Sequence, residues 1–171
     1  MSNIAGSDLV RLSFDLREAG ISVETATGLV GWAISEFAMG RCAYLAAAVC
    51  KASSREHFVS FVHPDGRMAH AAVAMSPQIK DSPLAGNGAD ILGRRPLRTI
   101  ESEVRALCGP VRIIVGCLPD DLDPLEEKAL LDFAGGLPWF RGLAGRNDDL
   151  VASAEALGFR PGQPLKDGPG S

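Results

Sequence analysis

The first third of the chain places apolar residues at helical spacing. Residues 7–19 carry leucines three and four positions apart and are followed by Gly20, which predicts a helix. Residues 25–39 continue this spacing as far as Gly40 and predict a second helix, although its interior glycines weaken it. Residues 41–52 are polar only at their two ends, so we expect a third helix that is apolar on all sides and buried.

The pattern then changes from helical to strand-like. Residues 57–62 and 68–75 are two apolar runs of strand length, separated by a strong turn signal of the type Pro-Asp-Gly. They predict an antiparallel hairpin. With a loop of four residues, 63–66, Val59 falls opposite His70.

Glycine and proline divide the rest of the chain. Residues 76–98 predict a long loop with one short strand, Ala89–Gly93, inside it. Beyond this loop the pattern predicts helices that start at Thr99, Asp123 and Asp149, and a strand over 111–117. Trp139 and Phe140 are expected to anchor a loop in the core.

These elements together predict a single α+β domain over residues 1–160. We expect the N-terminal helices, including the buried central helix that carries Cys42, to pack on an antiparallel sheet, with further helices at the C-terminal end. The length of 171 residues is enough to bury a core, and 46% hydrophobic residues is ordinary for a globular protein. Residues 161–171 are rich in glycine and proline, and we expect them to form a disordered tail.

Charge and composition argue against several classes of partner. The net charge is −4, basic residues are scattered and aromatic residues make up only 6%, so nucleic acid is not an expected partner. No apolar run reaches the roughly 18 residues of a membrane span, and no membrane partner is expected. The N-terminus lacks the features of a signal peptide. We therefore expect a cytoplasmic protein, or one exported by a signal-independent secretion system.

The four cysteines are dispersed along the chain. None belongs to a Cys-x-x-Cys pair, so the sequence predicts neither a metal site nor a cofactor. Cys50, Cys108 and Cys117 lie on apolar faces and are predicted to be core residues. Cys42 differs because it opens the most apolar helix.

Cys42 has the local setting of a nucleophilic thiol. It follows Gly40 and Arg41 at the start of the buried helix, where the helix dipole and free N–H groups favour a thiolate. Its own backbone N–H is a candidate oxyanion donor. A nucleophile of this kind also needs an imidazole to share its proton and a third polar group to orient the ring.

Two further residues match these needs. His70 lies in the run Ala-His-Ala-Ala-Val, on the same strand face as Ala72 and Ala74, and is the candidate imidazole. Asp90, which precedes Ile-Leu-Gly, is the candidate third group, and Asp81 is its rival.

The order of these motifs resembles a known superfamily. Gly-x-Cys at the start of a helix of small residues, then His-Ala-Ala-Val, then Asp-Ile-Leu-Gly is similar to the papain-like and transglutaminase-like cysteine hydrolases, in particular their bacterial papain-fold branch. The resemblance covers residues 32–93. It implies Cys42 as nucleophile, His70 as general base and acid, and Asp90 as the orienting group.

The chain departs from that pattern at two places. Where papain-type enzymes carry a glutamine shortly before the cysteine, this chain has Ser35 and Glu36, and where transglutaminases carry a tryptophan it has Ala72. These differences favour a simpler peptidase, amidase or protein deamidase.

The sequence thus predicts a cysteine hydrolase that acts on an amide-type bond of a protein or peptide, of a kind that would suit a bacterial effector or toxin. Two alternatives stay open. One is a catalytically inert papain-like or α/β module that binds a protein, which Glu36 favours. The other is a small-molecule acyltransferase with the same triad, which would need a hydrophobic acyl pocket.

Overall fold

The computed structural model describes residues 7–38, 40–53, 57–75, 82–116 and 118–163. Three helices come first: α1 (Ser7–Glu18), α2 (Val23–Phe37) and α3 (Cys42–Ser53). Strands β1 (Phe58–Val62), β2 (Met68–Ala74), β3 (Asn87–Asp90) and β4 (Gly93–Pro96) follow, and then α4 (Leu97–Cys108) and β5 (Arg112–Val115). The chain continues through α5 (Pro124–Gly136), α6 (Arg141–Ala144) and α7 (Leu150–Ala156). The predicted α+β fold is confirmed.

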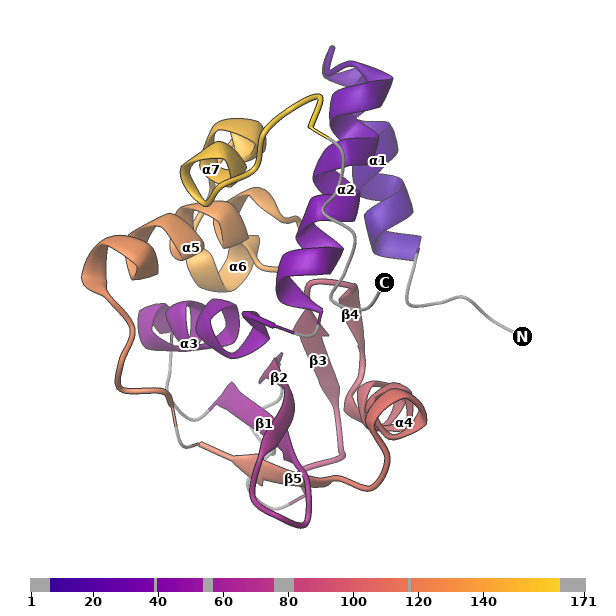
Figure 1. Ribbon diagram of the computed structural model, residues 1–171, viewed down its shortest axis with the longest axis vertical. Helices are drawn as coiled ribbons and strands as arrows, with labels where there is room; N and C mark the ends of the chain where they lie inside the picture. Colours follow the sequence, from indigo (N-terminus) through magenta and orange to yellow (C-terminus); the bar gives the residue numbers. More distant parts are fainter. Residues whose placement is uncertain (1–6, 39, 54–56, 76–81, 117, 164–171) are drawn as a thin grey trace.

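The five strands form one antiparallel sheet in the order β4-β3-β2-β1-β5. Helix α3 covers one face, with α5, α6 and α7 stacked beyond it, whereas α4 covers the other face (Figure 1). Strand alternation explains the two apolar layers: Ala71 and Val73 of β2 face the α3 layer, and Ala72 and Ala74 face α4.

Aromatic packing holds the end of α2 against α5, just before α3 begins. Ser22 caps α2 by accepting a hydrogen bond from the Thr25 N–H at 3.1 Å. At its other end, Phe37 stacks on Phe133 of α5 with ring centroids 5.4 Å apart, and Trp32 meets the same ring edge-on at 5.6 Å. The chain then turns sharply, because α2 and α3 are bent by 92° relative to each other.

The predicted burial of the third helix is confirmed for the face that meets the sheet and α5. Its buried residues are Cys42, Leu45, Ala46, Ala47, Ala48, Val49 and Cys50. Tyr44 is only half-buried and donates a hydrogen bond from its hydroxyl to Asp121 at 3.0 Å. In the described ranges no single helix is long and apolar enough to cross a membrane, and α2 and α3 meet that test only as a bent pair.

The β1–β2 hairpin is present, but the predicted register is wrong. The structure pairs Phe61 with His70 and Val59 with Ala72, so that His70 lies two residues away from its expected partner. One residue of the shift comes from a shorter loop, because the His63 N–H bonds to the Arg67 carbonyl at 2.8 Å. The other comes from a bulge that leaves Ala69 without a partner.

The segment predicted as a long loop contains a second hairpin. β3 extends from Asn87 to Asp90, so the expected strand starts earlier and ends at its aspartate, and β4 was not predicted. Asp90 pairs with Gly93 across a two-residue turn. Gly93 has a φ of +118°, and a Cβ there would collide with the carboxylate of Asp8, which accepts a hydrogen bond from the Arg94 N–H at 2.8 Å. Helix α1 therefore holds this hairpin in place.

The C-terminal predictions are largely confirmed. α4 begins two residues before Thr99 and ends at Gly109, and Asp123 caps α5 as expected. Trp139 and Phe140 are buried, but the short helix α6 that follows them was not predicted. Cys50 is fully buried, whereas Cys108 is only half-buried, at the margin of the α4 layer, because α4 turns that position toward the surface. Cys117 and residues 164–171 lie outside the described residues.

Candidate active site

Cys42 is the first residue of α3, directly after the sharp turn from α2. The turn is held by a hydrogen bond from the Arg41 N–H to the Glu36 carbonyl at 2.9 Å. The Arg41 guanidinium pairs with the Glu36 carboxylate at 3.6 Å and with Glu126 of α5. The negative charge of Glu36, which the sequence places close to the cysteine, is therefore partly offset by Arg41, which Glu36 shares with Glu126.

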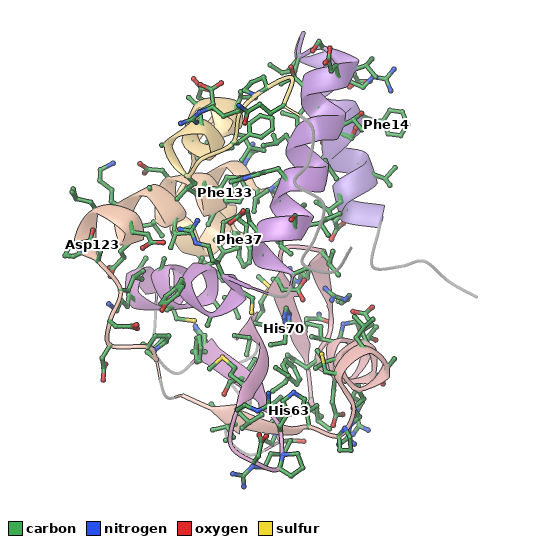
Figure 2. All side chains as sticks on the ribbon, in the orientation of Figure 1. Phe14, Phe37, His63, His70, Asp123 and Phe133 are labelled. Carbon is green, nitrogen blue, oxygen red and sulfur yellow. The ribbon has the colours of Figure 1, made fainter. Side chains whose placement is uncertain are left out.

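His70 connects Cys42 to Asp90 in the interior. It lies where the start of α3 meets β2 and β3 (Figure 2), with its ring nearly parallel to that of Phe61 at a centroid distance of 6.1 Å. Its Nε2 is 2.8 Å from Oδ2 of Asp90, and Cys42 is the second side chain that raises its pKa. Because Nε2 is engaged by Asp90, Nδ1 is the nitrogen that remains for the sulfur.

The three side chains are almost inaccessible. Cys42, His70 and Asp90 are 7%, 5% and 4% exposed. Beside His70 lies a cavity of about 80 Å³, whose lining includes Ala38, Asp90, Leu92 and Leu107. Its lining residues come from the end of α2, from β2, β3 and β4 and from α4, and Cys42 is not among them.

The Asp90 carboxylate is fully satisfied by donors. Oδ1 accepts hydrogen bonds from the Leu92 N–H at 2.9 Å and from Nη1 of Arg95 at 2.7 Å. Oδ2 accepts a hydrogen bond from Nη2 of Arg95 at 3.0 Å in addition to its bond with His70. The Trp139 indole N–H donates to the Asp90 backbone carbonyl at 2.8 Å, so the loop before α6 also fixes this residue.

Arg95 carries the network onward to α4. Its Nε and Nη2 both donate to Oε2 of Glu103, at 2.8 and 2.5 Å. Arg95 is itself buried, whereas the Glu103 side chain is 30% exposed. The chain of groups thus alternates in charge from the interior to the surface: His70, Asp90, Arg95, Glu103.

These contacts shift the ionisation of the buried groups. Burial lowers the pKa of His70, but hydrogen bonds to Asp90 and Cys42 and their negative charges outweigh it and raise the pKa to about 9. Burial raises the pKa of Asp90, but its bonds to His70 and Arg95 outweigh this and lower it to about 2. Burial lowers the pKa of Arg95, whereas Asp90 and Glu103 raise it further, with a net rise. Histidine is therefore a cation and aspartate an anion at neutral pH.

The structure brings together the three residues predicted from the sequence. Asp81, the rival to Asp90, lies outside the described residues. Arg95, Glu103 and Trp139 were not anticipated as members of the site. A predicted two-residue turn at Ile91 and Leu92 would have identified Arg95. Such a turn pairs Asp90 with Gly93 and Gly88 with Arg95, which places Arg95 on the same face of the hairpin as Asp90.

The arrangement of potential ligand side chains in the described residues does not indicate a metal site. Within the described ranges, no three His, Cys, Asp or Glu side chains are grouped as metal ligands. Comparison with known proteins finds no protein-family model, no curated protein and no solved structure that matches this chain. The site geometry is thus the basis for assigning a function.

Proposed function

We propose that this protein is a cysteine hydrolase that cleaves an amide-type bond with Cys42, His70 and Asp90. The observation that carries the proposal is the position of His70, whose Nε2 is 2.8 Å from the buried Asp90 carboxylate and whose pKa is raised by Cys42 as well as by Asp90. A carboxylate orients the base in the same way in triads of this kind on unrelated folds.

Each residue would have a distinct role in the reaction. In the resting site Nδ1 of His70 already holds the proton of Cys42, and the thiolate attacks the carbonyl carbon of the substrate. A bond forms from Sγ to carbon, and the carbon–nitrogen bond breaks as His70 returns the proton to the leaving amine or ammonia. Water, deprotonated by His70, then attacks the thioester and releases the acid with the free thiol.

Asp90 and the start of α3 would stabilise the charged states of this cycle. Asp90 holds His70 with Nδ1 toward the sulfur and balances the imidazolium. The N-terminal end of α3 favours negative charge at Cys42, and the Cys42 N–H is the donor we assign to the oxyanion. Arg41, which pairs with both Glu36 and Glu126, weakens the repulsion that the Glu36 carboxylate would exert there.

A second candidate function is a non-catalytic protein-binding module. The observation that favours it is the saturation of Asp90 by Arg95, because a bidentate buried ion pair also serves to fix a fold. In that case the network from Cys42 to Glu103 would be a structural core, and its residues would affect stability but no reaction.

The test compares the wild type with two variants, each of which replaces one cysteine by serine. A peptide mixture is incubated with the protein, with Cys42→Ser, and with the matched control Cys108→Ser, and mass spectrometry records new N-termini and conversion of glutamine to glutamate. We expect products from the wild type and from Cys108→Ser and none from Cys42→Ser. Products that persist in Cys42→Ser, or that are missing with the folded wild type, would assign the network to the structural role.

A further inference from the structure

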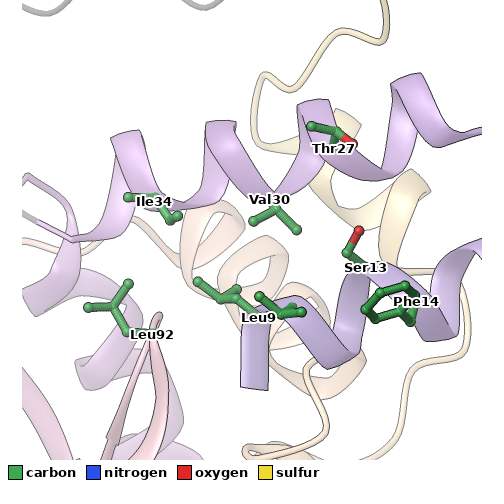
Figure 3. A pocket seen from close by; sticks show the side chains of 8 residues that line it. Leu9, Ser13, Phe14, Thr27, Val30, Ile34 and Leu92 are labelled. Carbon is green, nitrogen blue, oxygen red and sulfur yellow. The ribbon is translucent and has the colours of Figure 1, made fainter. Parts of the chain in front are cut away.

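Helix α1 has two sides of different character. Leu9, Ser13 and Phe14 line an apolar groove beside α2 (Figure 3). The opposite side of the helix carries residues spaced three and four positions apart, which are Asp8, Arg11, Leu12 and Asp15. These four residues face the β3–β4 hairpin and the start of α6 across a second pocket.

Arginines from three elements meet at this second pocket. Its volume is about 380 Å³, within the range of small-molecule sites. Arg11 comes from α1, Arg94 from β4 and Arg141 from the start of α6. We call it the arginine pocket, and its complete lining is Asp8, Arg11, Leu12, Asp15, Arg94, Pro138, Trp139 and Arg141.

The three guanidinium groups of the arginine pocket are not used by the fold. Among the residues that the structure describes, none of them forms an ion pair or donates a side-chain hydrogen bond. Arg95, the neighbour of Arg94, instead donates to both Asp90 and Glu103. Because arginine stays protonated in proteins, the pocket holds three permanent positive charges with free donors.

The two carboxylates of the pocket do not cancel these charges. Asp8 is engaged by the hairpin backbone, because its Oδ2 accepts a hydrogen bond from the Arg94 N–H at 2.8 Å. Asp15 lies one helical turn after Arg11 but forms no ion pair with it. Three positive and two negative side chains leave the pocket cationic in a chain of net charge −4. A small anion is therefore the ligand that this pocket favours.

We propose that the arginine pocket binds a small organic phosphate monoester, whose phosphate group is held by Arg11, Arg94 and Arg141. Guanidinium groups match phosphate oxygens with paired N–H donors. A phosphate monoester carries a charge of about −1.5 to −2 at pH 7 and three acceptor oxygens, so it can use donors from three directions. A carboxylate has one charge and two oxygens, which a single guanidinium satisfies.

The rest of the pocket has room for the organic part of the ligand. Leu12, Pro138 and Trp139 form an apolar wall, and Pro138 is exposed. Trp139 is fixed in this wall, because its indole N–H donates to the Asp90 carbonyl at 2.8 Å. Neither Cys42 nor His70 lines the pocket, so this inference does not depend on the proposed hydrolase activity.

Isothermal titration calorimetry with three probes tests the inference, at about pH 7.5, where a phosphate monoester is a dianion, and at constant ionic strength. We expect phenyl phosphate to bind saturably with a Kd below about 1 mM. Inorganic phosphate should bind more weakly, because it lacks the ring that contacts the apolar wall. Benzoate should also bind more weakly, because it has the ring but one charge.

Five single substitutions at exposed positions locate the bound phosphate. Arg11→Gln, Arg94→Gln and Arg141→Gln each remove one charged donor and should weaken phenyl phosphate binding at least about tenfold. Arg98→Gln removes an exposed arginine of α4 outside the pocket and should leave the affinity unchanged. Asp15→Asn removes a negative charge from the pocket and should tighten binding about two- to fivefold. Circular dichroism confirms that each variant is folded.

The inference is supported if phenyl phosphate binds most tightly of the three probes and only the pocket arginines are required. It is overturned if phenyl phosphate shows no saturable binding, or if benzoate or inorganic phosphate binds as tightly. It is also overturned if any one of the three pocket variants keeps the wild-type affinity, or if Arg98→Gln weakens binding as much as they do. None of these results bears on the role of Cys42.

Discussion

Asp90 and Arg95 form a two-point ion pair in the interior, with hydrogen bonds of 2.7 and 3.0 Å between the guanidinium and the two carboxylate oxygens. The pair places a permanent positive charge against both carboxylate oxygens, including Oδ2, which is also hydrogen-bonded to His70. It explains how a carboxylate that is 4% exposed stays ionised beside the histidine. The orientation of His70 therefore depends on an arginine whose side-chain hydrogen bonds go to Asp90, Gly93 and Glu103.

Removing Arg95 should destabilise the fold strongly. Arg95→Met leaves the Asp90 charge buried with one cation fewer, and we expect the free energy of unfolding to fall by about 3–5 kcal/mol. The control is Glu103→Gln at the outer end of the network, where the side chain is 30% exposed and the loss should stay below about 1 kcal/mol. Urea denaturation measures both. Equal losses would mean that Arg95 acts through Glu103 and not through Asp90.

Stability should also depend on pH in a defined direction. The folded-state pKa of His70, about 9, lies above the ordinary value of 6.5, so His70 contributes stability below pH 6.5 that is lost as the pH rises through 9. The folded-state pKa of Asp90, about 2, lies below the ordinary 3.8, so its contribution is present above pH 3.8 and lost as the pH falls through 2. We expect the combined contribution of these two groups to the free energy of unfolding to be largest between pH 3.8 and pH 6.5.

The histidine part of this profile can be isolated. Between pH 6.5 and 9 the wild type should lose on the order of 3 kcal/mol of unfolding free energy that His70→Ala does not lose. Denaturant titrations of both chains at several pH values measure the difference. Parallel curves for the two chains would contradict a raised pKa for His70.

The hairpin that carries Asp90 should be sensitive to a single methyl group. Gly93 and Gly66 both have positive φ, at +118° and +89°, but only Gly93 faces the Asp8 carboxylate. Alanine at either position is strained by the backbone, and at Gly93 it also displaces Asp8 from the Arg94 N–H. Gly93→Ala should therefore cost about 1–3 kcal/mol more than Gly66→Ala in thermal or urea unfolding. Equal costs would show that α1 does not hold the hairpin.

Local signals in the sequence were enough to predict most helices. Asp123 followed by Pro124 starts α5, and Gly109 ends α4, because caps and breakers act over a few residues. The apolar run from Cys42 to Cys50 predicted a buried helix for the same reason. The order of Cys42, His70 and Asp90 along the chain was enough to propose their association.

Contacts between distant segments could not be predicted in this way. The bulge at Ala69 shifts the register of His70, and nothing in the local alternation indicates it. β4 is stabilised by its pairing with β3 and by Asp8 of α1, so its own four residues carry little strand signal. Arg95 and Trp139 meet Asp90 through the pairing and packing of these elements, so no local pattern indicates them as members of the site.

The most direct test of the account is the reactivity of Cys42. His70, with its pKa raised to about 9, is a cation at pH 6, and the proposed mechanism requires its proton to come from the Cys42 sulfur. Burial raises the pKa of the Cys50 thiol to about 12, so Cys50 should not react in the folded protein. Cys108 has no such histidine partner among the described residues and serves as a half-buried reference thiol.

The measurement is the rate of iodoacetamide alkylation at about pH 6, mapped to each cysteine by mass spectrometry in the wild type and in His70→Ala. The account predicts that Cys42 reacts fastest in the wild type and that its rate falls on the order of tenfold or more in His70→Ala, with Cys108 unchanged. A Cys42 rate no higher than that of Cys108, or one that does not respond to the loss of His70, would contradict it.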